Sequence, residues 1–103
     1  MDTMLDCFVE EVYVMENQEF TIYTEKDICL NGRISEGCLH LESYVSGDDF
    51  SSEKYYDLSK AESDKLFSLI SLEDFIELCK REKLTGMEEY FRRNNIQVQT
   101  YVW

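Results

Sequence analysis

Hydrophobic and polar residues alternate along much of the first half of the chain, as they do in half-buried β-strands. The alternation predicts strands over 20–24, 27–34 and 38–45, rich in β-branched and aromatic residues, with a turn at 35–37. The dipeptide Asn31-Gly32 offers a competing tight turn, which would leave two short strands in place of the second one. We therefore expect the first half of the chain to be mainly β-structure.

The stretch 5–15 fits two structures. Its apolar residues are spaced as on one face of a helix, whereas Val12-Tyr13-Val14 is typical of a strand. We favour a strand from Phe8 onward.

The second half carries three helix starts. Ser59, Ser71 and Thr85 each precede an acidic residue three positions later, which is the capping-box pattern or, after Ser71, its close relative with Asp. We therefore predict three helices, near 60–70, 72–82 and 86–94.

Beyond a stop at Asn94-Asn95, apolar and polar residues alternate again over 96–102. Strands, then helices, then a last strand indicate an α+β fold, in which about three helices pack on one face of an antiparallel sheet and the C-terminal strand returns to it. We expect residues 1–103 to form a single domain, with a β-rich half over 1–58 and a helical half plus the last strand over 59–103.

Charge is distributed unevenly between these halves. The chain has 22 acidic and 10 basic residues and a net charge of −12. Residues 1–58 contain 14 acids and 3 bases, and residues 59–103 contain 8 acids and 7 bases. Such a field repels nucleic acid and anionic membranes and attracts cationic proteins. The expected partner is therefore a basic protein, not nucleic acid or a membrane.

Catalytic chemistry is poorly represented. The sequence has no phosphate-binding loop, metalloprotease motif or calcium loop, and His40 is the only histidine. The cysteines, expected to be buried and reduced, lack metal-ligand spacing; they are Cys7, Cys29, Cys38 and Cys79. The first residues lack a signal-peptide pattern. We therefore expect a cytoplasmic, monomeric, non-enzymatic protein with no catalytic residue, metal or cofactor.

The segment 44–57 combines aromatic and acidic side chains in a sequence typical of a loop. Aromatic residues anchor protein interfaces, and carboxylates pair there with Lys or Arg. We predict a partner-binding surface that comprises Glu42, Asp48, Asp49, Phe50, Glu53, Tyr55 and Asp57. The alternative is that Tyr55 and Tyr56 begin a further strand, with one of them in the core.

The arrangement from Phe20-Thr21-Ile22-Tyr23 through Asn31-Gly32-Arg33-Ile34 to Asn94-Asn95-Ile96, together with the acidity, resembles bacterial immunity proteins of contact-dependent growth inhibition and polymorphic toxin systems. The resemblance implies a cytosolic inhibitor that binds a cognate toxin, often a basic nuclease. The alternative is a phage-type mimic of nucleic acid that inhibits a host nuclease. A mimic would be expected to spread carboxylates over its whole surface.

Overall fold

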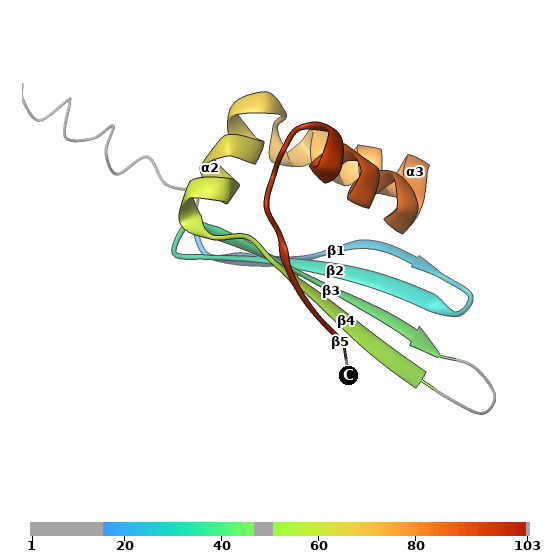
Figure 1. Ribbon diagram of the computed structural model, residues 1–103. Helices are drawn as coiled ribbons and strands as arrows, with labels where there is room; N and C mark the ends of the chain where they lie inside the picture. Colours follow the sequence, from blue (N-terminus) through green and yellow to red (C-terminus); the bar gives the residue numbers. More distant parts are fainter. Residues whose placement is uncertain (1–15, 47–50, 103) are drawn as a thin grey trace, which may run out of the picture.

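The computed structural model describes residues 16–46 and 51–102. These residues form a five-stranded antiparallel sheet whose strands follow in the order β1-β2-β3-β4-β5, with two helices between β4 and β5 (Figure 1). The strands are β1 (Gln18–Glu25), β2 (Ile28–Ser35), β3 (Cys38–Ser46), β4 (Ser51–Asp57) and β5 (Gln99–Val102). The helices are α2 (Lys60–Leu69) and α3 (Leu72–Arg93).

The α+β fold predicted from the sequence is confirmed in outline. Both helices lie on one side of the sheet, and the last strand returns to pair with β4 (Figure 1). The three strands predicted over 20–24, 27–34 and 38–45 correspond to β1, β2 and β3. Asn31 and Gly32 lie inside β2, so the alternative tight turn at this dipeptide is wrong.

The prediction of three helical segments is confirmed in outline. The serine hydroxyls of Ser59 and Ser71 accept the backbone N–H groups expected of N-caps, at 3.2 and 3.0 Å. The predicted second and third helices, however, form the single element α3, which is interrupted by non-helical backbone at Lys83 (φ 64°, ψ −166°). This break lies two residues before Thr85, so it agrees with the predicted boundary between a helix ending near 82 and a helix beginning near 86. Neither helix combines the length and the apolarity needed to cross a bilayer.

The core lies between the sheet and the helices. Alternate residues of β2 and β3 point toward the helices and are almost fully buried: Leu30, Ile34, Leu39 and Leu41. From the helices they meet Leu66, Phe75, Cys79, Met87 and Phe91. Leu69, the last residue of α2, lies outside this core and is 52% exposed.

Gly32 is required by the packing of the neighbouring strand. It pairs with Phe20 of β1, and a Cβ atom at Gly32 would lie 2.4 Å from Phe20 Cε2. The aromatic ring occupies the space that a side chain would fill. The absence of that side chain lets Phe20 cover β2 from the helix side.

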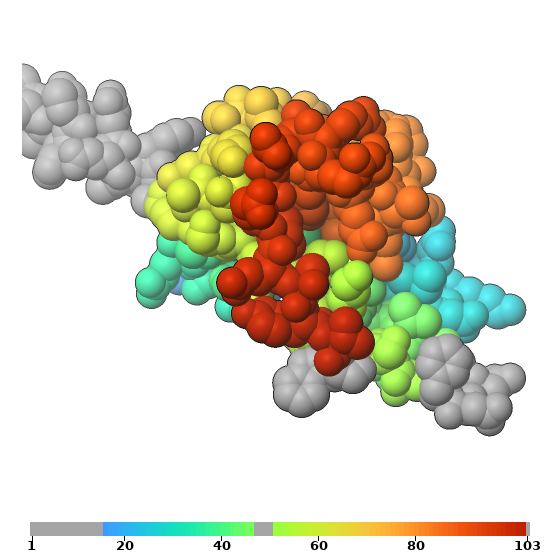
Figure 2. All heavy atoms as spheres, in the orientation of Figure 1, coloured from blue at the N-terminus to red at the C-terminus, as the bar shows by residue number. Residues whose placement is uncertain are grey.

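The final strand is shorter and more exposed than the alternation over 96–102 predicts. Ile96 is buried and Val98 packs against the core, but pairing with β4 begins only at Gln99. All four residues of β5 are exposed. The apolar residues Ile96 and Val98 pack in or against the core before the strand begins. The strand β5 itself is therefore left at the exposed edge of the sheet (Figure 2).

Candidate functional site

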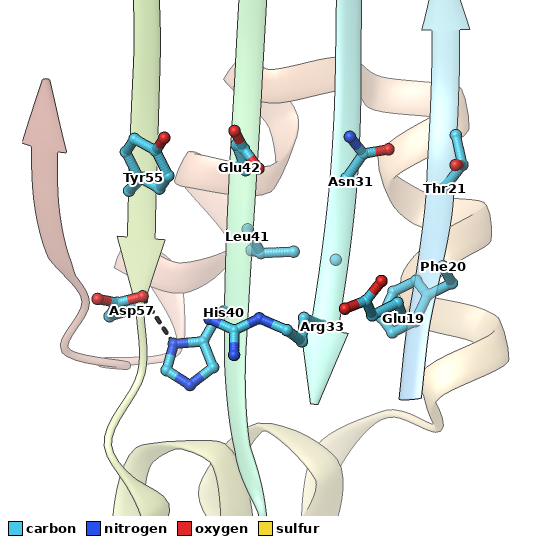
Figure 3. A pocket seen from close by; sticks show the side chains of 11 residues that line it. Glu19, Phe20, Thr21, Asn31, Arg33, His40, Leu41, Glu42, Tyr55 and Asp57 are labelled. Atoms are coloured by element: carbon cyan, nitrogen blue, oxygen red, sulfur yellow. Dashed lines mark hydrogen bonds and ion pairs between the residues drawn. The ribbon is translucent and has the colours of Figure 1, made fainter. Parts of the chain in front are cut away.

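The face of the sheet opposite the helices carries two rows of polar side chains that run across the strands. Register aligns Glu19, Arg33, His40, Asp57 and Gln99 in the first row. The second row consists of Thr21, Asn31, Glu42, Tyr55 and Tyr101. We call this surface the open face; Figure 3 shows its central part.

A shallow trough of about 510 Å³ lies between the two rows. Its floor is formed by Phe20, Gly32 and Leu41, which occupy the strand positions between the rows and whose side chains, where present, pack toward the helices. The walls are polar, as Figure 3 shows. The trough can therefore receive a polar or charged side chain without disturbing the core.

His40 and Asp57 form a cross-strand pair at one end of the trough. His40 Nδ1 lies 2.8 Å from Asp57 Oδ1, and the two side chains are 28% and 36% exposed. An ionised carboxylate can only accept a hydrogen bond, so Nδ1 is the donor. The second ring nitrogen points away from Asp57 (Figure 3). This pair fixes the orientation of both side chains on the open face.

Tyr55 lies in the second row, on the other side of the trough, where two carboxylates affect its pKa. Its hydroxyl donates to Glu53 Oε1 at 2.5 Å. This hydrogen bond, with the nearby charge of Glu42, raises the pKa of Tyr55 to about 12. Ionisation would place a further negative charge beside two existing ones. Tyr55 therefore remains a neutral phenol, with its ring available for contact.

The open face has a strong excess of acid. In the part of the chain that the structure describes, it carries the carboxylates of Glu19, Glu42, Glu53 and Asp57 against the single guanidinium of Arg33. In the helix layer, by contrast, acids lie close to bases: Asp64 with Lys60, Glu62 with Lys65, Glu77 with Lys80, and Glu89 with both Arg92 and Arg93. The negative field is therefore concentrated on the sheet side.

The open face brings together four of the residues predicted to bind a partner: Glu42, Glu53, Tyr55 and Asp57. The other three, Asp48, Asp49 and Phe50, lie outside the described residues. The predicted loop segment 44–57 instead contains the end of β3 and all of β4, and its Tyr56 is buried, as the alternative assignment held.

Sequence reasoning did not include the rest of the two rows, notably Glu19, Asn31, Arg33 and His40. A signal for them existed. They alternate with the buried residues of β1, β2 and β3, so the same parity that predicts the core also places them on the opposite face.

The cysteines do not share one environment. Cys79 is fully buried in α3, and burial raises its pKa to about 12. Cys29 and Cys38 are only half-buried and lie on the open face, which corrects the expectation that each cysteine is a core residue. Cys29 Sγ lies 3.6 Å from Asn31 Oδ1. Cys7 is not among the described residues. Within 16–46 and 51–102, no three His, Cys, Asp or Glu side chains are grouped as metal ligands.

A smaller hollow lies on the helix side of β4. It is lined by Tyr56, Glu88 and Lys54, together with the segment that follows α3. The Glu88 carboxylate in this hollow already accepts hydrogen bonds from the Tyr56 hydroxyl and the Lys54 ammonium. The open face is therefore the better candidate for a binding surface.

Protein-family models, curated proteins and solved structures were compared with this chain, and none of them matches it.

Proposed function

We propose that this chain is a cytoplasmic inhibitor of the immunity-protein type, which binds and neutralises a basic toxin, such as a nuclease, through the open face. The observation that carries the proposal is the grouping of three carboxylates, Glu19, Glu42 and Asp57, and the ring of Tyr55 around one trough on the face of the sheet opposite α2 and α3. A fourth carboxylate, Glu53, lies on the same face. Carboxylates attract Lys and Arg, and the ring supplies apolar contact area.

The one-sided charge supports an inhibitor of a single basic surface over a mimic of nucleic acid. The helix layer carries nearly as many bases as acids, and many of them form close pairs. A mimic must reproduce the regular negative charge of a phosphate backbone along its length. The open face offers a compact acidic patch instead.

Co-expression provides the test. The polypeptide encoded immediately upstream in the source genome should be basic and toxic when expressed alone, and this chain should restore growth and bind it. Glu19→Lys and Glu42→Lys should slow association at low salt by at least about tenfold, because steering depends on the field of the open face. Added salt should reduce the difference, since screening acts over about 8–10 Å.

Matched controls come from α3. Glu73→Lys and Glu77→Lys make the same charge change on the exposed surface of the helix layer and should leave association nearly unchanged. Tyr55→Ala should act differently by speeding dissociation, at a cost of at least about 2 kcal/mol. Equal sensitivity of both surfaces would favour the nucleic-acid mimic. A neighbouring polypeptide that is neither basic nor toxic would remove the immunity assignment.

A further inference from the structure

In the part of the chain that the structure describes, β5 is an edge strand without the usual protection against strand pairing. Gln99–Val102 contains no charged residue and no proline, and all four residues are exposed. Tyr101 and Val102 are 48% and 70% exposed, which makes them two of the few large exposed hydrophobics among the described residues. An edge strand presents backbone N–H and C=O groups that can pair with another chain, and natural proteins usually block them with charge, proline or bulges.

The opposite edge of the sheet is protected. β1 carries Glu19 and Glu25, and its register shifts between Thr21 and Tyr23 as at a β-bulge. Lys83 of α3 also reaches over this edge, with its Nζ 2.5 Å from Glu25 Oε2. Among residues 16–46 and 51–102, therefore, the sheet is blocked at the β1 edge and unpaired at the outer edge of β5.

The side chains of β5 extend the two rows of the open face. Gln99 pairs with Asp57, Tyr101 pairs with Tyr55, and the Tyr101 hydroxyl donates to Gln99 Oε1 at 2.9 Å. A strand added beside β5 would place every second side chain next to these rows, close to the acidic patch. Its other side chains would lie beside Thr100 and Val102, which are uncharged.

We propose that an extended segment of the cationic partner pairs with the outer edge of β5 and becomes a sixth strand. Basic residues alternate with uncharged, β-branched residues in this segment, and the basic ones point to the open face. The inference rests on the proposed function, because the partner's positive charge is taken from it. A second copy of this chain fits less well, since it would bring another net charge of −12 to the same surface.

A peptide probe separates strand addition from simple charge attraction. The probe is a short capped peptide in which Lys and Val alternate, and the control has the same composition with all Lys residues before all Val residues. The alternating peptide should bind at least about tenfold more tightly. On binding, exchange of the backbone amides that point outward from 99–102 should slow at least about tenfold, because only backbone pairing protects them.

Two further versions of the alternating peptide, N-methylated on its Lys or on its Val residues, keep every charge but lose backbone donors on one edge. Strand addition uses one edge of the peptide, so only one of the two versions should lose binding, again by about tenfold or more. Among protein variants, Val102→Lys should weaken binding. Leu69→Lys also replaces an exposed aliphatic residue by Lys, but at the end of α2, and should leave binding unchanged.

Several outcomes would overturn the proposal. These are equal binding of the alternating and block peptides, equal binding of both N-methylated versions, and protection of 99–102 in the free protein. Protection that rises with protein concentration would identify a second copy as the occupant. If the block peptide binds as well as the alternating one, and binding is lost in Glu42→Lys, the acidic surface of the proposed function stands and strand addition alone fails.

Discussion

The Tyr56 hydroxyl in β4 donates a 2.6 Å hydrogen bond to the Glu88 carboxylate in α3, and so joins the sheet to the second half of that helix. Lys54 Nζ approaches the same Glu88 oxygen at 3.3 Å. Burial of the Tyr56 side chain makes the largest contribution to raising the pKa of the phenol, and the hydrogen bond to Glu88 makes the next largest. Glu88 therefore acts between two layers of the fold, although its spacing from Arg92 in the sequence is typical of a pair within one helix.

Tyr56→Phe should lower the free energy of unfolding by about 1–2 kcal/mol, because it removes the hydrogen bond to the charged Glu88 carboxylate. The loss is modest because water can reach the partly exposed Glu88. Urea denaturation measures the change. In a Glu88→Gln background the same substitution should cost less, since the charged acceptor is already absent. An identical cost in both backgrounds would mean that the charge of Glu88 does not strengthen this hydrogen bond.

At Lys83, unlike at ordinary helix positions, a Gly variant should be more stable than an Ala variant. Its backbone angles, φ 64° and ψ −166°, lie in a region that is nearly restricted to glycine. Lys83→Gly and Lys83→Ala both remove the contacts of the ammonium with Glu25 and with the Tyr23 ring. Only the Gly variant relieves the backbone, so it should be the more stable of the two by about 1 kcal/mol.

The matched control for Lys83 is Arg81, an exposed residue within the helical part of α3. There Ala should be more stable than Gly by about 1 kcal/mol, as in ordinary helix interiors. If urea denaturation showed Ala to be more stable than Gly at position 83 as well as at position 81, the helix would be continuous through Lys83.

Glu62 should make stability sensitive to acid. Its carboxylate accepts the Gln97 N–H at 2.9 Å and lies 3.1 Å from Lys65 Nζ, and these contacts, the first above all, lower its pKa. The contribution is fully present above the unfolded-state pKa of about 4.3 and is lost as pH falls through the folded-state value. Glu62→Gln keeps an acceptor but does not titrate.

The thermal midpoint of Glu62→Gln should therefore fall less on acidification than that of the parent chain. Glu77→Gln removes a carboxylate with a longer contact, 3.7 Å from Lys80, and serves as the control. A Glu62→Gln variant that loses stability as steeply as the parent chain would show that this carboxylate does not hold the segment before β5.

Thiol reactivity should separate the cysteines. Because burial raises the pKa of Cys79 to about 12, almost no thiolate is present near neutral pH, and native Cys79 should resist alkylation. The half-buried Cys29 and Cys38 should react earlier. Peptide mass spectrometry after timed iodoacetamide treatment measures each site. In denaturant without reductant, all four thiols of the chain should react. Fewer than four, or equal rates for Cys79 and Cys38, would contradict the assignment.

Local signals in the sequence were sufficient for the features that depend on local contacts. The caps at Ser59 and Ser71 are formed by side chains that bond residues three positions away, so the sequence identifies both helix starts. The alternation in β2 and β3 likewise identifies the buried leucines. The pattern at Thr85 likewise indicates the helix boundary, which the structure has at Lys83. The contacts of Lys83 with Glu25 and Tyr23 were not predictable in this way, because these residues are distant in the sequence.

The candidate site was only partly predictable for the same reason. Tyr55 and Asp57 could be suggested from a segment rich in aromatic and acidic residues, but their neighbours depend on strand register. The shift between Thr21 and Tyr23 buries both Ile22 and Tyr23, which no simple alternation anticipates. Only the paired strands reveal that Glu19, Arg33, His40 and Asp57 form one row.

The order of the strands also has a consequence for how the chain folds. Each of the first four strands pairs with its neighbour in the sequence, so their hairpins close over short loops at a small entropic cost. β5 must instead reach β4 across both helices. We therefore expect the first four strands to pair before β5 joins them. In that order, the rows of the open face up to Asp57 form first, and the outer edge of β5 forms only when β5 pairs with β4.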